Sequence, residues 1–377
     1  MVGDSVLNTD VLPWVNLCLA SCGLLIFSLR IFWPQLKLTR KPSVSHKSLG
    51  SDTSVSILIP ARNEALNLPT LLDSIAALKK SVPFEVILID DHSEDDTYKV
   101  AERYKEVFDL KLLKAKPLAT GWAAKSWALY QAVESARYEH LLFIDADIAL
   151  KPDSLNNALS FMHQHGADMI SALPYHRSQN LWEKFMGPFH FLILLGTAPF
   201  QSPSVKRLFS IGQFLLFKRD AYLAVGGHAS VKRSFAEDIE LARLILKRGL
   251  SYKLFPQAEI FSVRMYQDIE AFFQGWKRLI RVGFKQSSAL ASLEVGLVIF
   301  SLVQVTVLAS KPWQALPGIV ILLQMLLQQK RLGEFSFLGV ICWPFALGFF
   351  IFTSLFSLAE SLTAKPVVWK GRAYKQQ

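Results

Sequence analysis

The sequence has few cysteines and lacks several familiar signatures of function. Its three cysteines, Cys18, Cys22 and Cys342, lie in apolar stretches without metal-ligand spacing to histidine, and an odd number does not suit a disulfide framework. No glycine spacing typical of a P-loop occurs. The net charge is +10, yet no long Lys/Arg run with interleaved aromatic residues is present, which makes nucleic acid the least favoured partner. There is also no internal repeat and no low-complexity tract.

Long apolar runs are abundant instead, and 51% of the residues are hydrophobic. Residues 11–33 form a run long enough to cross a bilayer hydrocarbon layer of ~30 Å. Acidic Asp4 and Asp10 precede the run. Basic residues cluster at and after its end: Arg30, Lys37, Arg40, Lys41 and Lys47. A cleaved signal peptide has basic residues before its apolar core, so this arrangement predicts an uncleaved membrane anchor followed by a cytoplasmic domain.

The C-terminal region is also apolar. Residues 270–291 combine aromatic and basic side chains at helical spacing, which is typical of an amphipathic helix on a membrane surface. Three apolar stretches follow, at residues 295–309, 313–327 and 335–358, and Pro344 interrupts the last of them. We therefore expect this whole region to be embedded in a membrane.

The charges of the tail leave the number of crossings open. If the preceding domain is cytoplasmic, three full crossings place four basic residues outside, against the usual distribution of charge: Lys365, Lys370, Arg372 and Lys375. Either one stretch is re-entrant or interfacial, or the tail is an exception. The stretches contain no charged residue beyond Glu294 and Glu360 near their ends, which argues against a transporter.

Between these ends, short apolar runs alternate with amphipathic stretches. Residues 55–60, 84–90 and 140–144 are rich in β-branched or aromatic residues and predict buried parallel strands. Apolar residues at helical spacing lie between them, which indicates βαβ units in a doubly wound α/β sheet. The expected division is an anchor at 1–34, a linker at 35–54, an α/β domain at 55–269, an interfacial helix at 270–291, transmembrane helices at 292–360 and a basic tail at 361–377.

Polar motifs directly follow the first two expected strands. Pro60-Ala61-Arg62-Asn63-Glu64 follows the first, and Asp90-Asp91-His92-Ser93-Glu94-Asp95-Asp96-Thr97 follows the second. Ligands of open α/β sheets bind beyond the carboxyl ends of the strands, so Asn63, Glu64 and Asp91 are placed to contact a nucleotide. The alternative is that these polar residues only cap the helices that follow.

Two acidic pairs follow further along the chain. Asp145 and Asp147 end the third expected strand, where two carboxylates can approach one hard divalent cation that neutralises a diphosphate. A surface turn is the weaker interpretation, because acids at the end of a buried strand are costly unless something pairs with them. Glu237-Asp238 precedes an amphipathic helix, and a carboxylate there can take a proton from an acceptor hydroxyl. Acids in the first turn of a helix are the alternative.

Two further segments carry cationic or aromatic side chains. Lys125, in Gly121-Trp122-Ala123-Ala124-Lys125-Ser126, begins an expected helix and can pair with phosphate, although an ordinary solvated lysine is the alternative. Gln274-Gly275-Trp276-Lys277-Arg278 can cover the acceptor and the diphosphate, and it also fits the interfacial helix described above. The residues expected to form this cap come from that segment and from the acidic pair: Gln274, Trp276, Arg278 and Glu237.

Four of these motifs, taken in order, resemble family-2 glycosyltransferases of the GT-A fold: Pro-Ala-Arg-Asn-Glu, Asp-Asp-x-Ser-x-Asp-x-Thr, Asp-Ala-Asp and Glu-Asp. The resemblance covers roughly residues 55–285 and is specific because the motifs fall in the same order. Three further segments resemble membrane-bound carotenoid glycosyltransferases of the diaponeurosporenoate type: Arg264-Met265-Tyr266-Gln267, Gln274-Gly275-Trp276 and the tail from Val368 to Tyr374. Hopanoid-associated glycosyltransferases are similar.

The resemblance implies a GT-A domain with an N-terminal transmembrane anchor and C-terminal transmembrane helices. It also implies that Asp91 contacts the nucleoside and that Asp238 is the general base. Asp147 would coordinate Mn²⁺ or Mg²⁺, and Asp145 would support the nucleotide and the metal. The other residues expected at the nucleotide-sugar site are Pro60, Asn63, Glu64 and Lys125. Processive polysaccharide synthases of this family carry Gln-Gln/Arg-x-Arg-Trp, and the Gln-Gly-Trp-Lys-Arg of this chain favours transfer of a single sugar instead.

The expected function is that of an inverting, metal-dependent hexosyltransferase in the cell membrane, with several crossings and a cytoplasmic catalytic domain. One glucose would move from UDP-glucose to a lipid, namely a carotenoid or a related terpenoid. The expected partners are therefore a nucleotide-sugar donor, a lipid acceptor and the membrane. One alternative is a transferase acting on polyprenyl phosphate or diacylglycerol. Another is an inactive membrane-bound binding protein, against which the intact Asp91, Asp147 and Asp238 argue.

Overall fold

The computed structural model describes residues 11–37, 53–78, 82–205, 207–286, 288–307, 311–362, 367–369 and 372–374. Contacts divide the chain into two compact units. The sheet unit comprises Lys41–Arg177, Ser202–Gln267 and Pro366–Gln377. The helical unit comprises Met1–Arg40, Ser178–Gln201 and Asp268–Lys365.

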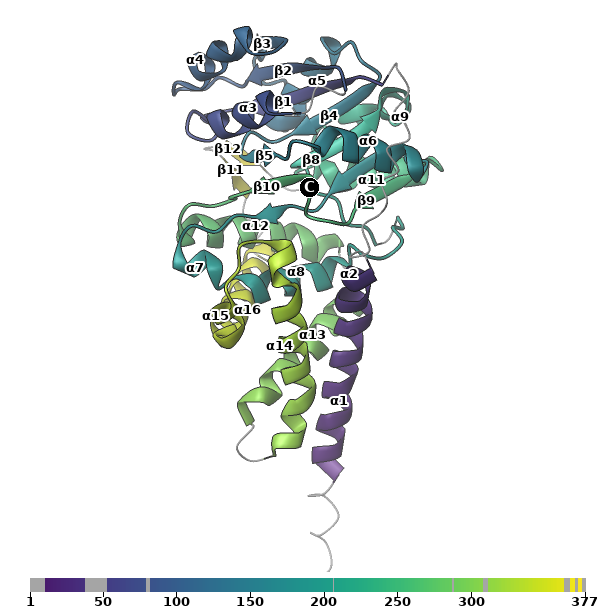
Figure 1. Ribbon diagram of the computed structural model, residues 1–377, viewed down its shortest axis with the longest axis vertical. Helices are drawn as coiled ribbons and strands as arrows, with labels where there is room; N and C mark the ends of the chain where they lie inside the picture. Colours follow the sequence, from purple (N-terminus) through teal and green to yellow (C-terminus); the bar gives the residue numbers. More distant parts are fainter. Residues whose placement is uncertain are drawn as a thin grey trace, which may run out of the picture. The chain divides into compact units, whose positions relative to one another are not determined.

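A seven-stranded sheet forms the centre of the sheet unit (Figure 1). In spatial order its strands are β3 (Leu110–Lys114), β2 (Phe84–Asp90), β1 (Val55–Ala61), β4 (His140–Ile144), β8 (Phe214–Lys218), β6 (Met169–Ala172) and β9 (Tyr252–Phe255). The first four of these strands are parallel, whereas β8 is antiparallel to both its neighbours, so the sheet is mixed. A smaller sheet contains β5 (Ile148–Leu150), β10 (Phe261–Val263) and β7 (Tyr175–His176), and β11 (Val367–Trp369) pairs with β12 (Arg372–Tyr374).

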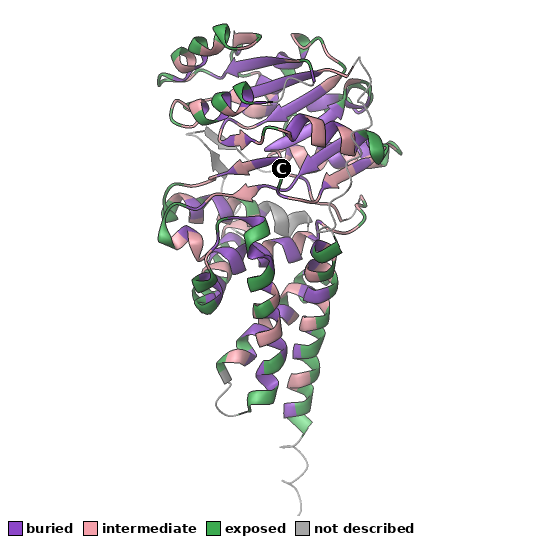
Figure 2. Cartoon of the chain, in the orientation of Figure 1, coloured by how far each residue is buried: buried purple, intermediate pink, exposed green. Residues whose placement is uncertain are grey.

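The central strands are buried on both faces because helices cover both sides of the sheet (Figure 2). Along β1, Ile57 and Ile59 belong to one hydrophobic cluster and Leu58 belongs to the other, because successive side chains of a strand point to opposite faces. The first cluster includes α3 (Leu68–Ala76), α4 (Thr97–Glu102) and α6 (Ser154–Gln164); the second includes α5 (Ala124–Glu134), α9 (Arg219–Ala224) and α11 (Glu237–Lys247). Two short helices, η2 (Arg103–Glu106) and α10 (Gly227–Ser230), lie in the connections. Burial on both faces explains why the sequences of these strands are continuous apolar runs.

The helical unit is built from helices, several of which are strongly apolar. The helices are α1 (Val11–Phe27), the π-helical turn η1 (Ser28–Phe32), α2 (Trp33–Lys37), α7 (Leu181–Lys184), α8 (Gly187–Thr197), α12 (Ile269–Gln286), α13 (Ala289–Val303), η3 (Gln304–Val307), α14 (Pro312–Leu332), α15 (Phe337–Ile341) and α16 (Trp343–Leu362). Within the described part of the chain, three stretches are long and apolar enough to cross a membrane: Val11–Lys37, Ala289–Thr306 and Trp343–Leu362. One therefore lies near the N-terminus and two lie in the C-terminal region.

The expected strands are confirmed, since β2 and β4 have the expected bounds and β1 ends one residue later, at Ala61. The expected break at Pro344 is also present, because α15 ends at Ile341 and α16 begins at Trp343. The expected interfacial helix at 270–291 is divided, with α12 ending at Gln286 and α13 beginning at Ala289.

Two features differ from the expected division of the chain. Residues 178–201, expected within the α/β domain, belong to the helical unit, because α8 is apolar and almost entirely buried among other helices. The helical stretch that begins at Val11 continues to Lys37 and so includes the start of the expected linker. Residues 38–52 of that linker, and the tail lysines Lys365, Lys370 and Lys375, lie outside the described residues.

Candidate active site

The loops that follow β1 and β2 are joined by hydrogen bonds. Backbone N–H groups of the first loop donate to side chains of the second: Asn63 to Ser93 (3.0 Å), Glu64 to Thr97 (2.7 Å) and Ala65 to Asp95 (3.1 Å). In return, the side-chain oxygen of Asn63 accepts a hydrogen bond from the backbone N–H of Glu94 (2.8 Å). Asn63 has a φ of 53°, a left-handed conformation that asparagine tolerates better than most residues. Both polar motifs therefore form one connected edge at the carboxyl ends of the strands.

Asp91 lies directly beyond β2 on this edge and is only 6% exposed. Its backbone N–H donates to the carbonyl of Ala61 (2.8 Å), and its own carbonyl accepts a hydrogen bond from the Arg62 guanidinium (3.1 Å). The ring nitrogen Nδ1 of His92 lies 3.6 Å from the Asp91 carboxylate. The backbone of Asp91 is thus held by the end of β1 and by the side chain of Arg62.

The other residues of these two motifs make local contacts. Pro60 is part of β1, and the Glu64 carboxylate accepts a hydrogen bond from the side-chain amide of Asn67 (2.8 Å). Asp95 accepts hydrogen bonds from the hydroxyl and the backbone N–H of Thr97, the latter at 3.0 Å. Burial opposes ionisation of Asp95, but these hydrogen bonds outweigh it and lower the pKa of the carboxyl. Asp95 is therefore an ionised connector between the loop and the start of α4.

Lys125 joins the acidic groups of two other elements. It is the second residue of α5, and its Nζ lies 2.7 Å from Asp145, directly after β4, and 3.0 Å from Glu237, the first residue of α11. The same ammonium group donates to the carbonyl of Gly212 (3.4 Å). Burial alone lowers the pKa of a lysine, but the two carboxylates outweigh it and raise the pKa of Lys125. Lys125 therefore stays charged and is not an ordinary solvated lysine.

Asp238 is the next residue of α11 and has an unusual protonation equilibrium. Burial and the negative charge of Glu237 raise the pKa of Asp238 to about 7. The charge of Lys125 and hydrogen bonds from the backbone N–H groups of Ile239 (2.8 Å) and Gly212 act in the opposite direction. A carboxyl group with a pKa near neutrality can accept a proton from a hydroxyl under physiological conditions.

Gly212 lies against all three charged side chains, although no sequence pattern singles it out. A Cβ atom at this position would lie 3.0 Å from Lys125 Nζ, 3.3 Å from Glu237 Oε1 and 3.5 Å from Asp238 Oδ2. The residue precedes β8, which is antiparallel to its neighbours, and no sequence motif links it to the acidic pairs. Only the folded arrangement reveals that a side chain here would crowd the site.

His228 supports the same region from inside the protein. It is fully buried, its ring lies 4.9 Å from that of Phe143, and its Nδ1 is 2.8 Å from the Tyr222 hydroxyl. Burial, together with the nearby charge of Lys125, lowers the pKa of His228 to about 3, so the ring is neutral. The preceding Gly227 has a φ of 50°, and a Cβ there would lie 2.4 Å from the Tyr222 ring, so glycine is required.

The donor set suits a hard divalent cation, although the protein alone does not provide a complete site. Asp147 is half-buried and lies two residues beyond Asp145. When Asp238 is ionised, the carboxylates of Asp145, Glu237 and Asp238 exceed the single charge of Lys125, which leaves a negative site. Within the described ranges, no group of three or more His, Cys, Asp or Glu residues could hold a metal ion. A cation here would need further oxygen ligands, such as those of a diphosphate.

The expected cap residues are divided between the two units. Glu237 is in the sheet unit beside Lys125, whereas Gln274, Trp276 and Arg278 are on α12 in the helical unit. Trp276 is buried there, with its ring 5.2 Å from that of Phe189. The contacts of Trp276 are those of a packed helix, and its expected role over the diphosphate stays a prediction.

Residues 56–226 match the protein family described as glycosyl transferase family 2. The matched segment runs from β1 to just beyond α9. It includes the loops that follow β1 and β2, together with Lys125 and Asp145. The chain carries a glycosyl transferase family 2 domain. The expected family and the expected α/β fold class of the GT-A type, with an apolar helix before it and apolar helices after it, are confirmed.

A curated relative is similar over almost the whole chain. The 4,4'-diaponeurosporenoate glycosyltransferase of Staphylococcus aureus is 29% identical over 371 residues, which cover 94% of each chain. Among solved structures, a mannosyltransferase from Pyrobaculum calidifontis with GDP-mannose and Mn²⁺ has a TM-score of 0.49, with 16% identity, over 91% of this chain and 99% of that one. Glucosyl-3-phosphoglycerate synthase from Mycobacterium tuberculosis has a TM-score of 0.42, with 16% identity, over 62% and 79% of the two chains.

Proposed function

We propose that this glycosyltransferase transfers one glucose from UDP-glucose, with inversion, to the hydroxyl group of a carotenoid or a related terpenoid at a membrane. The observation that carries the proposal is the position of Asp238. Its pKa of about 7 and its place beside the Lys125–Glu237 ion pair suit a general base that receives the proton of an alcohol. An alcohol needs such a base because its own pKa is far above neutrality.

The reaction requires four coupled changes. The acceptor oxygen forms a bond to the anomeric carbon, and the proton of the hydroxyl passes to the Asp238 carboxylate. The bond between the anomeric carbon and the diphosphate oxygen breaks, and its electron pair leaves with UDP. Attack from the side opposite the diphosphate inverts the anomeric configuration. Lys125 holds Glu237 and Asp145 in place across the site, so the base and the strand-end acid keep fixed positions.

The donor would lie along the carboxyl edge of the parallel strands. Buried Asp91, whose backbone is held by Ala61 and by the Arg62 side chain, is the proposed contact for the nucleoside. Asn63 and Glu64 lie in the neighbouring loop, which is bonded to the loop of Asp91. Asp147, with Asp145, would hold Mn²⁺ or Mg²⁺ together with oxygen atoms of the diphosphate, and such a cation neutralises the charge of the leaving group. The excess of carboxylates over Lys125 supports this assignment.

A lipid acceptor is supported by the helical unit and by the relative. In the part of the chain that the structure describes, three stretches are long and apolar enough to cross a membrane, which would hold the enzyme where an apolar acceptor dissolves. The similar protein of Staphylococcus aureus is a diaponeurosporenoate glycosyltransferase, and that name denotes a carotenoid acceptor. The basic residues that follow the first apolar run support a cytoplasmic catalytic domain in a multi-pass membrane protein.

The test is an assay of the full-length protein in lipid vesicles with radiolabelled UDP-glucose. Hydroxylated carotenoid, polyprenyl phosphate and diacylglycerol are offered separately, and labelled lipid is separated from labelled donor. We expect label in the carotenoid alone, with the inverted anomer in the product. Label in polyprenyl phosphate or diacylglycerol but not in carotenoid would contradict the proposed acceptor. Transfer only from GDP-mannose or UDP-N-acetylglucosamine would contradict the donor.

A carboxylate acceptor is the second candidate, because the name of the relative denotes a carotenoid acid. A carboxylic acid ordinarily has a pKa of about 4 and is already ionised at neutral pH, so it needs no general base. In that case Asp238 would only orient the acceptor. An assay that offers a carotenoid acid and a carotenoid alcohol in equal amounts separates the two candidates.

A further inference from the structure

In the helical unit, α14 lies against the N-terminal helical stretch along its full length. Polar side chains make the contacts in the same order on both elements: Gln314 donates to the carbonyl of Pro13 (3.2 Å), Gln324 to the hydroxyl of Ser28 (2.9 Å), Gln328 to the carbonyl of Phe32 (2.8 Å) and Arg331 to the carbonyl of Gln35 (3.0 Å). The two elements are therefore parallel. With 21 residues, α14 is about 32 Å long, which is enough to cross the ~30 Å hydrocarbon layer of a bilayer.

The helix α13 completes this bundle in the opposite direction. Glu294, near its start, forms an ion pair with Arg30 (2.5 Å), and Ser301, near its end, donates to the carbonyl of Ala20 (2.8 Å). A Cβ at Gly23 would lie 2.1 Å from the Ser301 hydroxyl, and one at Gly318 would lie 2.2 Å from the Ser301 carbonyl. Both glycines thus permit the close helix approach that is common inside membranes.

Composition alone does not mark α14 as a crossing. Among the described residues, the stretches apolar enough to cross are Val11–Lys37, Ala289–Thr306 and Trp343–Leu362, which include α16 but not α14. The reason is that α14 contains several glutamines, which lower its mean hydropathy. Gln314 and Gln328 are buried and hydrogen-bonded to neighbouring backbone, so these polar groups face protein and not lipid.

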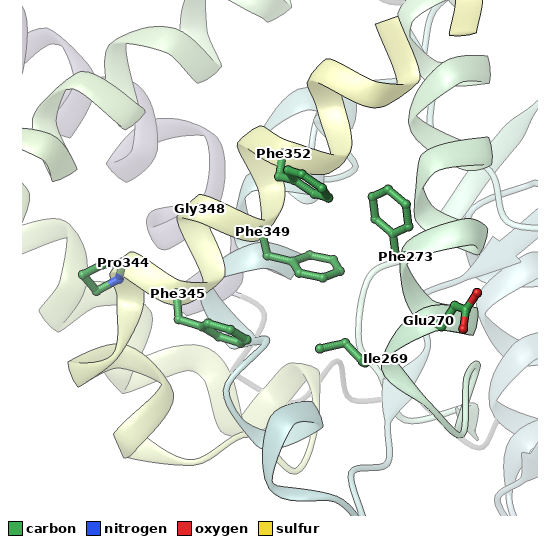
Figure 3. A pocket seen from close by; sticks show the side chains of 8 residues that line it. All are labelled: Ile269, Glu270, Phe273, Pro344, Phe345, Gly348, Phe349 and Phe352. Atoms are coloured by element: carbon green, nitrogen blue, oxygen red, sulfur yellow. The ribbon is translucent and has the colours of Figure 1, made fainter. Parts of the chain in front are cut away.

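The helix α16 has different neighbours. Its main contacts within the described residues are with α12 and α8, and not with α1, α13 or α14. It is parallel to α12, since Phe273 lies 5.4 Å from Phe352 and Lys277 forms an ion pair with Glu360 (2.8 Å). A groove of about 500 Å³ lies between parts of the two helices, and phenylalanine side chains of both line it (Figure 3).

The helix α8 links this pair of helices to one end of the bundle. Phe191 of α8 lies 5.9 Å from Phe27 at the end of α1, and Phe189 lies 6.0 Å from Phe349 of α16. A Cβ at Gly187 would lie 3.0 Å from Gln329, near the end of α14. Thus α8 and α16 gather at the end of the bundle where α1 and α14 both end. Figure 1 shows the lower turns of α1 and α14 extending away from this end.

We propose that the N-terminal helical stretch, α13 and α14 are the three membrane crossings, and that α12 and α16 form a surface inserted into the leaflet on the catalytic side only. Large exposed side chains on α16 provide the apolar area for that leaflet, among them Phe352 (49% exposed) and Leu355 (61%). An odd number of crossings from α1 to α14 returns the chain to the catalytic side. The basic tail then lies on the cytoplasmic side, in agreement with the usual distribution of positive charge.

Single cysteines in the full-length protein test this topology. In a background with Cys18, Cys22 and Cys342 replaced by serine, one cysteine is introduced at one of three positions. Lys311 directly precedes α14, Lys330 lies in its last turn, and Leu362 is the last residue of α16. All three positions are exposed. A membrane-impermeant maleimide is applied to intact cells and to inverted vesicles. Labelling in detergent verifies that each cysteine can react, and retained transferase activity verifies that each variant is folded.

We expect Lys330→Cys and Leu362→Cys to be labelled in inverted vesicles and to show only background labelling in intact cells. Lys311→Cys should be labelled in intact cells and show only background labelling in inverted vesicles. Reaction of Leu362→Cys on the same side as Lys311→Cys would mean that α16 crosses. Reaction of Lys330→Cys on the side of Lys311→Cys would mean that α14 does not cross. Either result overturns the proposal. If all three sites exchange sides together, the crossings are as proposed and only the cytoplasmic placement of the catalytic domain is wrong.

Discussion

The Nζ atom of Lys125 lies 3.0 Å from Oε1 of Glu237, so an ion pair ties the start of α5 to the start of α11. The same ammonium is 2.7 Å from Asp145, and its charge also acts on Asp238, whose pKa it lowers. One side chain thus holds the strand-end acid and adjusts the proposed base. Changes at Lys125 should therefore affect the pH dependence of catalysis and not only its rate.

Replacing Lys125 with methionine should lower kcat/KM by roughly 10²-fold, because it removes a fixed charge from the proposed diphosphate site. The acid limb of the pH–rate profile should also move to higher pH, since Asp238 loses the positive charge that lowers its pKa. The measurement is kcat/KM from about pH 5 to 9 in vesicles. An unchanged midpoint of the acid limb would show that Lys125 does not influence the base.

Two matched variants serve as controls for Lys125→Met. Lys125→Arg keeps the charge and should retain a midpoint close to that of the wild type. Lys218→Met breaks the ion pair with Asp168 (2.8 Å) on the surface, where such pairs contribute about 0–1 kcal/mol, and should leave the profile unchanged.

Asp238→Asn should reduce turnover with a hydroxyl acceptor by about 10²–10⁴-fold, the usual contribution of a general base. Binding of UDP-glucose should be unchanged, because the amide preserves the size of the side chain. The control is Glu240→Gln, in the same helical turn, where the carboxylate pairs with Arg243. Retention of most turnover by Asp238→Asn would favour the carboxylate acceptor.

The raised pKa of Asp238 also predicts a pH dependence of stability. The folded protein holds this proton up to about pH 7, whereas an unfolded aspartate loses it near its ordinary pKa of 3.8. The folded state therefore binds more protons over this window, so stability decreases as pH rises from about 4 to about 7. The measurement is Tm against pH for the wild type and Asp238→Asn. The variant should show a smaller decrease, and identical slopes would contradict the raised pKa.

Much of the sheet and of the acidic site could be predicted from the sequence. Apolar runs at 55–60, 84–90 and 140–144 predicted strands, because a strand buried on both faces lacks the usual alternation of apolar and polar residues. The acids that follow these runs indicated that the site lies at the carboxyl edge of the sheet. The ion pair of Lys125 with Asp145 and Glu237 could not be predicted, because it joins elements that only the folded sheet brings together.

The limits of prediction were physical in two other places. The importance of Gly212 depends on three charged side chains that would lie within 3.5 Å of a Cβ added at this position. No local sequence pattern indicates such a long-range contact. The placement of α8 was missed, because an apolar helix can be buried against a sheet or among other helices. The side of α14 that faces protein could not be predicted either, because hydropathy cannot distinguish a polar group that faces lipid from one that faces protein. In α14, Gln328 is buried and bonded to backbone, a fact that belongs to the packing and not to the sequence.

Gly212→Ala should disturb the site without unfolding the protein. The added Cβ would lie 3.0 Å from Lys125 Nζ, so the ammonium must move by a few tenths of an ångström and weaken its pairing. Because small displacements in an active site have large effects, kcat should fall roughly 10-fold while Tm changes little. The control is Gly296→Ala in α13, where the structure shows nothing within 4 Å of the new atom. Equal activity of both variants would contradict the expected crowding at Gly212.

Asp147→Ala should abolish transfer while the protein stays folded and in the membrane fraction. The variant removes the carboxylate proposed to hold the cation of the diphosphate, and removing one such electrostatic contribution typically costs about 10²–10³-fold in rate. Circular dichroism and membrane fractionation check the fold, and Asp220→Ala, an acid in the first turn of α9, is the matched control. For the wild type, EDTA should stop transfer, and added Mn²⁺ or Mg²⁺ should restore it. Full activity in EDTA would show that no divalent cation takes part, and Asp147 would then need another role in the turn between β4 and β5.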